Sequence, residues 1–165
     1  MALVLDNTVG GPSANTYCLV AEADDYHSTR GFNSEWSAAV VGDKNIVLAW
    51  ATRLLDQQEW LGIATYRSTG ILRWPRYGIV NRENIVVDPN TIPKFLKEAC
   101  AEWAWYLLKE NRTDDEGGLV QYGGKVGPIM DPDYFVRKVM PTSVKEILAP
   151  YLANIGGSMG RVLRG

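Results

Sequence analysis

The stretch DKNIVLAWATRLLDQQ, residues 43–58, decides the fold. Its apolar side chains recur at four-residue spacing along two neighbouring stripes, which is the pattern of an amphipathic α-helix. The stripes are Ile46, Trp50 and Leu54 on one line and Val47, Ala51 and Leu55 on the next. The sequence therefore predicts a core helix whose other face, with Lys44, Arg53 and Asp56, points to solvent.

A second wide apolar stripe predicts another long helix, from a cap at Thr91 to about Asn111. Shorter helices are expected over residues 21–30, near Ser34, and over residues 141–152, with a short strand at residues 85–87. Glycine and proline separate these segments and mark loops. The expected fold class is mainly α: a small helical bundle with a short β element and an extended C-terminal tail.

The length of 165 residues fits one domain with some chain left over. Turn-forming residues dominate the first twelve positions, and glycines recur close to the C-terminus. We therefore expect a flexible N-terminal segment over residues 1–12, a helical domain over residues 13–152 and a flexible tail over residues 153–165.

Charge is small overall and unevenly distributed. The formal net charge is -2, but six basic and three acidic residues give residues 119–165 a charge of +3, which leaves -5 for the rest. This balance disfavours a protein whose whole surface binds nucleic-acid phosphates. The polarity suits head-to-tail packing of copies. No apolar run approaches the ~18 residues that span a bilayer, so no membrane partner is expected.

Residues that could carry catalysis or bind a metal are few. His27 is the only histidine, and its place at the end of a short helix favours a structural role. Oxygen ligands could come from Asp24–Asp25 or residues 114–116, but consecutive carboxylates more often face solvent. Cys18 and Cys100 are expected to be reduced, buried thiols. We therefore expect no enzyme activity, no cofactor and no metal site.

The most distinctive segment is RWPRY, residues 73–77, in which Arg73 and Arg76 flank Trp74 and Pro75. One interpretation is nucleic-acid contact, with arginine on phosphate and an aromatic ring on a base. A second is a subunit or partner interface formed by Arg73, Trp74, Arg76 and Tyr77. In the third, Trp74 fills the core from a loop and the arginines form ordinary surface pairs.

The C-terminal end allows two interpretations as well. A glycine-rich end is often disordered, but apolar and basic side chains among the glycines could order in the groove of a partner. The candidate binding residues are Tyr151, Ile155, Met159, Arg161, Val162, Leu163 and Arg164.

Landmarks over most of the chain carry a family resemblance. They are Ser13–Tyr17, Ala23–Tyr26, Ala51–Asp56, Trp60–Gly62, Leu72–Arg76 with Gly78, Ile92–Pro93 with Ala99 and Glu102, Lys125–Ile129 and Leu148–Leu152. In this order and spacing the chain resembles head-tail connector proteins of tailed bacteriophages, a family also described as DnaT-like single-stranded DNA binding proteins.

The resemblance implies a structural virion protein, made in the bacterial cytoplasm and placed at the neck between head and tail. It implies a ring of copies, dodecameric in form, that extends the DNA channel and seats the next tail or head-completion protein. The implied partners are other copies of the chain, the portal protein, reached by the C-terminal residues, and passing genomic DNA without sequence-specific binding. The alternative function is a single-stranded DNA-binding replication accessory protein.

Overall fold

The computed structural model describes residues 3–109, 119–121, 134–136 and 140–153. The elements in chain order are α1 (Val20–Ser28), α2 (Ser34–Ala38), α3 (Val41–Asp56), β1 (Ile63–Ala64), β2 (Arg76–Tyr77), α4 (Lys94–Lys109), β3 (Leu119–Gln121), β4 (Tyr134–Val136), α5 (Thr142–Leu148) and a 3-10 turn, η1 (Ala149–Tyr151). The predicted mainly helical fold with a short β element is confirmed. The predicted C-terminal tail lies outside the described residues from residue 154 onward.

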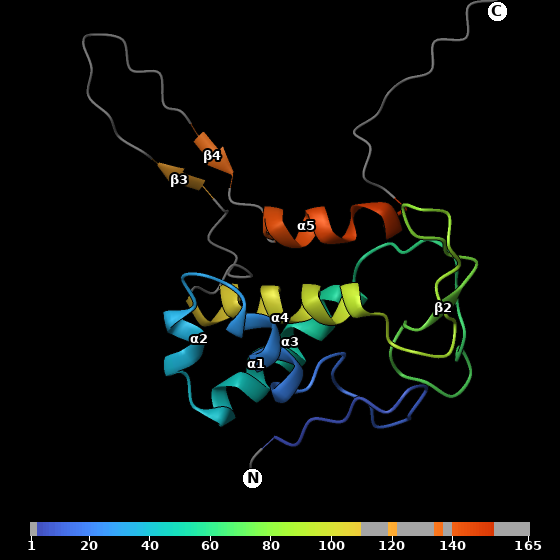
Figure 1. The fold of residues 1–165 in the computed structure, drawn as a ribbon, viewed down its shortest axis with the longest axis horizontal. Coiled ribbons are helices and arrows are strands. Elements are labelled where there is room, and N and C mark those ends of the chain that lie inside the picture. The colour runs from blue at the N-terminus through green and yellow to red at the C-terminus, as the bar shows by residue number, and fades with distance from the viewer. Residues whose placement is uncertain (1–2, 110–118, 122–133, 137–139, 154–165) are drawn as a thin grey trace, which may run out of the picture.

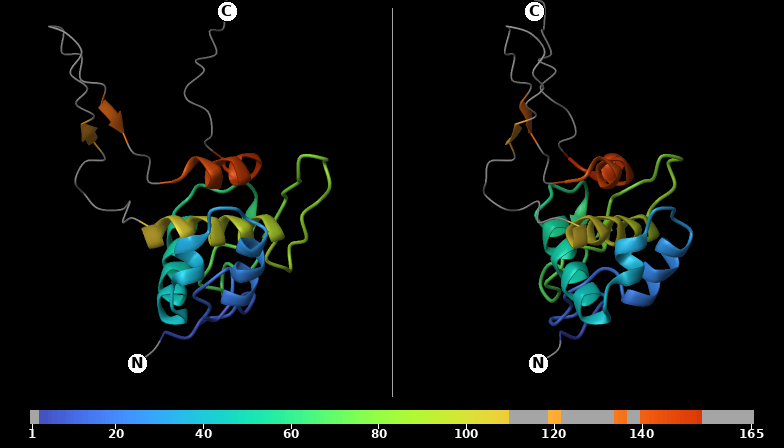
Figure 2. Two further views of the ribbon diagram at one scale, coloured as in Figure 1. Left: turned by 60° about the vertical axis from the view of Figure 1, so that its left-hand side comes forward. Right: turned by 90° about the vertical axis from the view of Figure 1, so that its left-hand side faces the viewer.

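Helix α4 is the centre of the bundle. Helix α5 covers one of its sides, and α1, α2 and α3 pack against the others (Figures 1 and 2). Every residue from Ala99 to Trp105 is buried, so the middle of this helix has no solvent-facing stripe. A helix that is enclosed in this way removes apolar surface from water around its whole circumference, which is the main stabilising contribution here.

Helix α3 packs along α4 and matches the predicted core helix within two residues at each end. Val47, Ala51 and Leu55 are buried as expected, whereas Ile46 on the neighbouring stripe is 53% exposed. The prediction that Lys44 faces solvent is wrong. Its ammonium group lies 2.8 Å from the carboxylate of Asp24 on α1, and this charge partner compensates its burial.

A buried ion pair fastens α1 to the central helix. The Glu102 side chain is 3% exposed, and its carboxylate lies 2.9 Å from the Arg30 guanidinium just beyond α1. The hydroxyl of Tyr26 donates a further hydrogen bond to Glu102, and the Arg30 guanidinium lies 3.7 Å from the centre of a Trp105 ring. The carboxylate is thus fully partnered although it sits in the core.

The strands are short and antiparallel. Strands β1 and β2 pair Ile63 with Tyr77, and β3 and β4 pair Leu119 with Val136. The strand predicted at residues 85–87 is reduced to an isolated bridge between Val80 and Val86. Among the described residues, no helix combines the length and the apolar character required to cross a bilayer.

The first residues of the chain make specific contacts. The amide of Asp6 donates to the Asn15 side chain, the amide of Asn15 donates to the Asp6 carbonyl, and the Asn45 side chain on α3 donates to the Leu3 carbonyl. Residues 3–15 are therefore tied to the helical domain, and the domain boundaries given above remain a prediction.

Candidate nucleic-acid interface

The loop between α3 and α4 holds the distinctive arginine segment, and Trp74 anchors it from inside. This side chain is 2% exposed and packs edge-on against Trp60 and Phe95, at ring-centre distances of 5.3 and 5.5 Å. Phe95 in turn stacks on Tyr151 at 3.7 Å. Trp74 therefore supports the loop through core packing, as in the third interpretation of the segment, and its ring is not offered to solvent.

Polar contacts pin the same loop to the end of α3. The Tyr17 hydroxyl donates to the Asp56 carboxylate and accepts the amide of Trp74 at 3.3 Å. The amide of Arg73 also donates to Asp56 at 3.3 Å. Burial raises the pKa of Asp56 despite these hydrogen bonds, and burial together with the Asp56 charge raises the pKa of Tyr17. The backbone at residues 73 and 74 is thereby fixed.

Arg76 on β2 organises the backbone around it. Its guanidinium donates to the carbonyls of Leu61 and Gly62 at 2.7 Å each, and to the carbonyl of Arg73 at 3.2 Å. Burial, followed by the neighbouring charge of Arg73, lowers the pKa of Arg76. With a longer hydrogen bond to the Trp60 carbonyl at 3.5 Å, Arg76 thus holds four separate carbonyl groups at one point, which gives it a mainly structural role.

A surface cavity of about 320 Å³ opens beside these contacts. Its lining consists of Gly62, Ile63, Ala64, Arg67, Arg73 and Arg76. Three guanidinium groups thus border one cavity, and none of these lining residues is acidic. The lining therefore carries three positive charges although the formal net charge of the chain is -2, and the nearest carboxylate, Asp56, is mostly buried behind Arg73. Such a surface favours an anion.

The wall that carries Arg67 is built by close backbone packing. Gly10 has a φ of +66°, and a Cβ atom there would lie 2.6 Å from the ring of Tyr66. A Cβ atom at Gly70 would lie 3.1 Å from the Cα of Gly10, and the Gly70 amide donates to the Tyr66 carbonyl. The N-terminal segment therefore presses on the turn at residues 66–70 and fixes the start of Arg67.

Apolar and aromatic side chains stand exposed beside the arginines. Tyr77 is 47% exposed on β2, across the strand pair from the exposed Ile63. Leu61 and Ile71 are exposed in the same loop. A positive groove with an accessible ring next to it is the combination found in surfaces that bind single-stranded nucleic acid.

The residues named from the sequence are only partly brought together. Arg73 and Arg76 share the cavity, whereas Tyr77, the next residue on β2, is not part of its lining. Tyr151 is buried in η1. Ile155, Met159, Arg161, Val162, Leu163 and Arg164 lie outside the described residues. Sequence reasoning missed Arg67, whose only signal was its place in the same glycine-bounded loop, six positions before Arg73.

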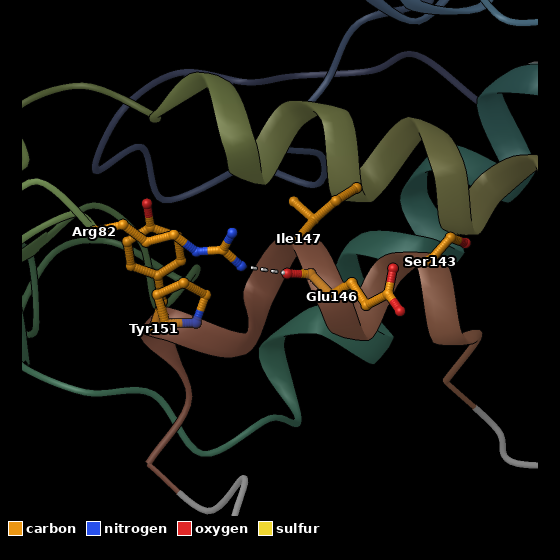
Figure 3. A pocket seen from close by; sticks show the side chains of 6 residues that line it. Arg82, Ser143, Glu146, Ile147 and Tyr151 are labelled. Carbon is orange, nitrogen blue, oxygen red and sulfur yellow. Dashed lines mark hydrogen bonds between the residues drawn. The ribbon is translucent and has the colours of Figure 1, made fainter.

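A second cavity, of about 620 Å³, lies between α5 and the loop at residues 79–87 (Figure 3). Arg82 reaches across it from the loop and donates to the Glu146 carbonyl at 3.2 Å, with Tyr151 and Ile147 nearby in the lining. The positive charge of Arg82 is thus already directed at the bundle, so this cavity offers less to an anion than the three-arginine cavity does.

His27 is buried in the helical core. Its Nε2 lies 3.1 Å from the carbonyl of Ala101, and its ring packs at 4.5 Å against Trp36. Burial lowers its pKa, so the neutral ring is favoured. Among the described residues, no group of three or more histidine, cysteine or acidic side chains is arranged to hold a metal ion.

Fold and surface together define a small helical protein with an arginine-lined cavity beside an exposed tyrosine. The chain belongs to the family described as "Putative DnaT-like ssDNA binding protein", whose sequence model matches residues 1–165. No curated protein and no solved structure matches the chain.

Proposed function

We propose that the protein binds single-stranded DNA at the arginine-lined cavity and at Tyr77. The observation that carries the proposal is the group of three arginines, without an acidic residue in the lining, in a chain whose family description names single-stranded DNA. Arginine contributes affinity through phosphates, and an exposed ring can stack on any base. Binding at such a surface would be independent of sequence.

The small net charge limits how strongly this surface can bind. Each phosphate neutralised on a single strand contributes a slope of about -0.7 to the dependence of log affinity on log salt. Two arginines that contact phosphates would give a slope of about -1.4. The expected complex is therefore weak, forms at low salt and dissociates as salt rises.

Titration of labelled oligothymidylate with the full chain tests this proposal. We expect binding at low salt with a shallow negative salt slope, and replacement of Tyr77 by alanine should weaken it about tenfold through lost stacking. The Phe32→Ala variant is the matched control, because this ring is 96% exposed but lies between α1 and α2. Absence of binding at low salt, or equal losses in both variants, would contradict the proposal.

The second candidate function is the non-enzymatic head-tail connector of a tailed phage, a ring between portal and tail. The observation that favours it is the presence of two groups of exposed apolar side chains on different elements. Val40, Val41 and Ile46 surround the start of α3, and Val80, Ile85 and Val86 lie on the loop before α4. Two unlike apolar patches suit head-to-tail contacts, which close into rings.

In this role the ring would be dodecameric, would surround passing DNA and would seat the next tail or head-completion protein. The C-terminal residues from Ile155 to Arg164 would contact the portal protein. The location would be the neck of the virion. Both functions place DNA near the protein. The first depends on the arginine-lined cavity and Tyr77, whereas the second depends on the two exposed apolar groups.

Electron microscopy of the protein mixed with the portal protein of the same virus tests the connector function. We expect rings on the portal, and Val86→Asp should abolish them, because a buried charge without a partner opposes a head-to-tail contact. Ile71→Asp is the matched control, since Ile71 is equally accessible but belongs to neither apolar group. If rings persist in Val86→Asp, the apolar group around Val86 does not form the contact between copies. If the wild-type chain forms no rings, the connector function is refuted.

A further inference from the structure

Two guanidinium groups at the cavity have donors left for a ligand. Arg76 directs its guanidinium to backbone carbonyls, as described above. The Arg73 side chain makes one long hydrogen bond, 3.4 Å, to the Gln58 carbonyl. Within the described part of the chain, the Arg67 side chain makes no hydrogen bond or ion pair. Arg67 and Arg73 therefore line the cavity with most of their N–H groups available.

The charges around the cavity are mostly of one sign. Arg73 and Arg67 both disfavour the charged form of Arg76, and the buried Asp56 carboxylate favours it. An oxyanion between the three guanidinium groups would add attraction on the solvent side of the cavity. Guanidinium groups pair two parallel N–H donors with two oxygens of a phosphate, which adds geometric selectivity to the charge.

Size and rigidity also fit a small anionic group. The cavity of about 320 Å³ is at the lower limit of ligand sites, roughly 300 Å³. Arg73 is fixed at its amide by Asp56, and Arg67 follows the turn that Gly10 presses on. Both arginines thus project from restrained backbone, which reduces the ordering cost of ligand binding.

We propose that this cavity binds one phosphate group of a nucleic-acid strand, with Arg67 and Arg73 as direct ligands and Arg76 as a positioning residue. The inference rests on the proposed single-stranded DNA binding and deepens it by naming the chemical group and its ligands. The phosphate can be an internal diester or the monoester at a strand end, because both present oxygens to a guanidinium fork.

Nuclear magnetic resonance of the arginine Nε–Hε groups in the full chain tests the site. Inorganic phosphate, titrated against chloride at constant ionic strength, is expected to shift the Arg67 and Arg73 signals in one saturable step. The Arg67→Gln and Arg73→Gln variants should each weaken this binding at least fivefold. Arg53→Gln is the matched control, because it removes one exposed arginine on α3 outside the cavity lining. Its phosphate affinity should equal that of the wild type.

The positioning role of Arg76 needs a separate readout. In Arg76→Lys the charge remains, but the forked contacts to the Leu61 and Gly62 carbonyls are lost. We expect weaker phosphate binding together with shifted amide signals at residues 61–64, while amide signals of α4 stay unchanged. Unchanged phosphate affinity in this variant would refute the positioning role.

Oligonucleotides distinguish the source of the phosphate and separate this inference from the proposed function. A preference for 5′-phosphorylated over 5′-hydroxyl oligothymidylate would assign a monoester, and equal affinity would assign an internal diester; either supports the site. Failure of inorganic phosphate to shift Arg67 and Arg73 would overturn the inference, even if oligonucleotides bind elsewhere. Phosphate binding at these arginines without any oligonucleotide binding would overturn the proposed function and the nucleic-acid part of this inference.

Discussion

Replacement of Arg30 by alanine is expected to lower the free energy of unfolding by about 3 kcal/mol, because it leaves a buried carboxylate without its charge partner. The Glu102 side chain is 3% exposed in the middle of α4, so its carboxylate has little access to water. The same substitution removes the guanidinium that covers the Trp105 ring at 3.7 Å. Urea denaturation followed by tryptophan fluorescence measures the change.

An exposed ion pair on the same helix supplies the control for this measurement. Lys94 is 89% exposed and lies 3.6 Å from Glu98. Its replacement by alanine should cost less than about 1 kcal/mol, as for other solvent-exposed pairs. The double variant Arg30→Ala with Glu102→Gln should recover part of the loss, because the remaining buried group is then neutral. Equal effects of Arg30→Ala and Lys94→Ala would show that burial of Glu102 carries no penalty.

Gly62→Ala is expected to destabilise the fold by about 3 kcal/mol, through backbone strain and overpacking. The residue has a φ of +67°, which L side chains rarely adopt. A Cβ atom would lie 2.4 Å from the Tyr77 carbonyl oxygen and 2.7 Å from a side-chain carbon of Ile79. Separation of β1 from β2 would also displace the Gly62 carbonyl that Arg76 binds.

Gly42→Ala is a control with the opposite expected sign. Gly42 lies in the first turn of α3, and no atom approaches within 4 Å of a Cβ built there. Alanine is favoured over glycine in a helix by up to about 1 kcal/mol, so this variant should be equally stable or more stable. Thermal unfolding of both variants gives the comparison, and a stable Gly62→Ala protein would argue against the tight turn described here.

The long helices could be predicted because their signal is local. Repeats of apolar residues over four turns indicated α3 and α4 directly, and the core residues Val47 and Leu55 followed from the same pattern. The burial of Lys44 could not be predicted, because its partner Asp24 lies twenty positions earlier on another helix. Periodicity assigns a face to a helix but does not say which charges a neighbouring helix brings to it.

The candidate site was only partly predictable for a similar reason. The sequence singled out Arg73 and Arg76 as a pair, but it left three roles open for Trp74. The burial of Trp74 depends on Trp60 and Phe95, which approach from both ends of the loop. Arg67 lines the cavity because the turn at residues 66–70 lies close to β2. No local sequence pattern predicts that the two segments are neighbours.

The contact between the Gly10 backbone and the Tyr66 ring makes the start of the chain part of the cavity's support. A change in the length or bulk of residues 8–11 would move the Tyr66 turn and shift Arg67 relative to Arg73. At the proposed phosphate site, such a change would alter the affinity for an anion although no arginine in the sequence is replaced. A position without ligand contact would then control the geometry of the site.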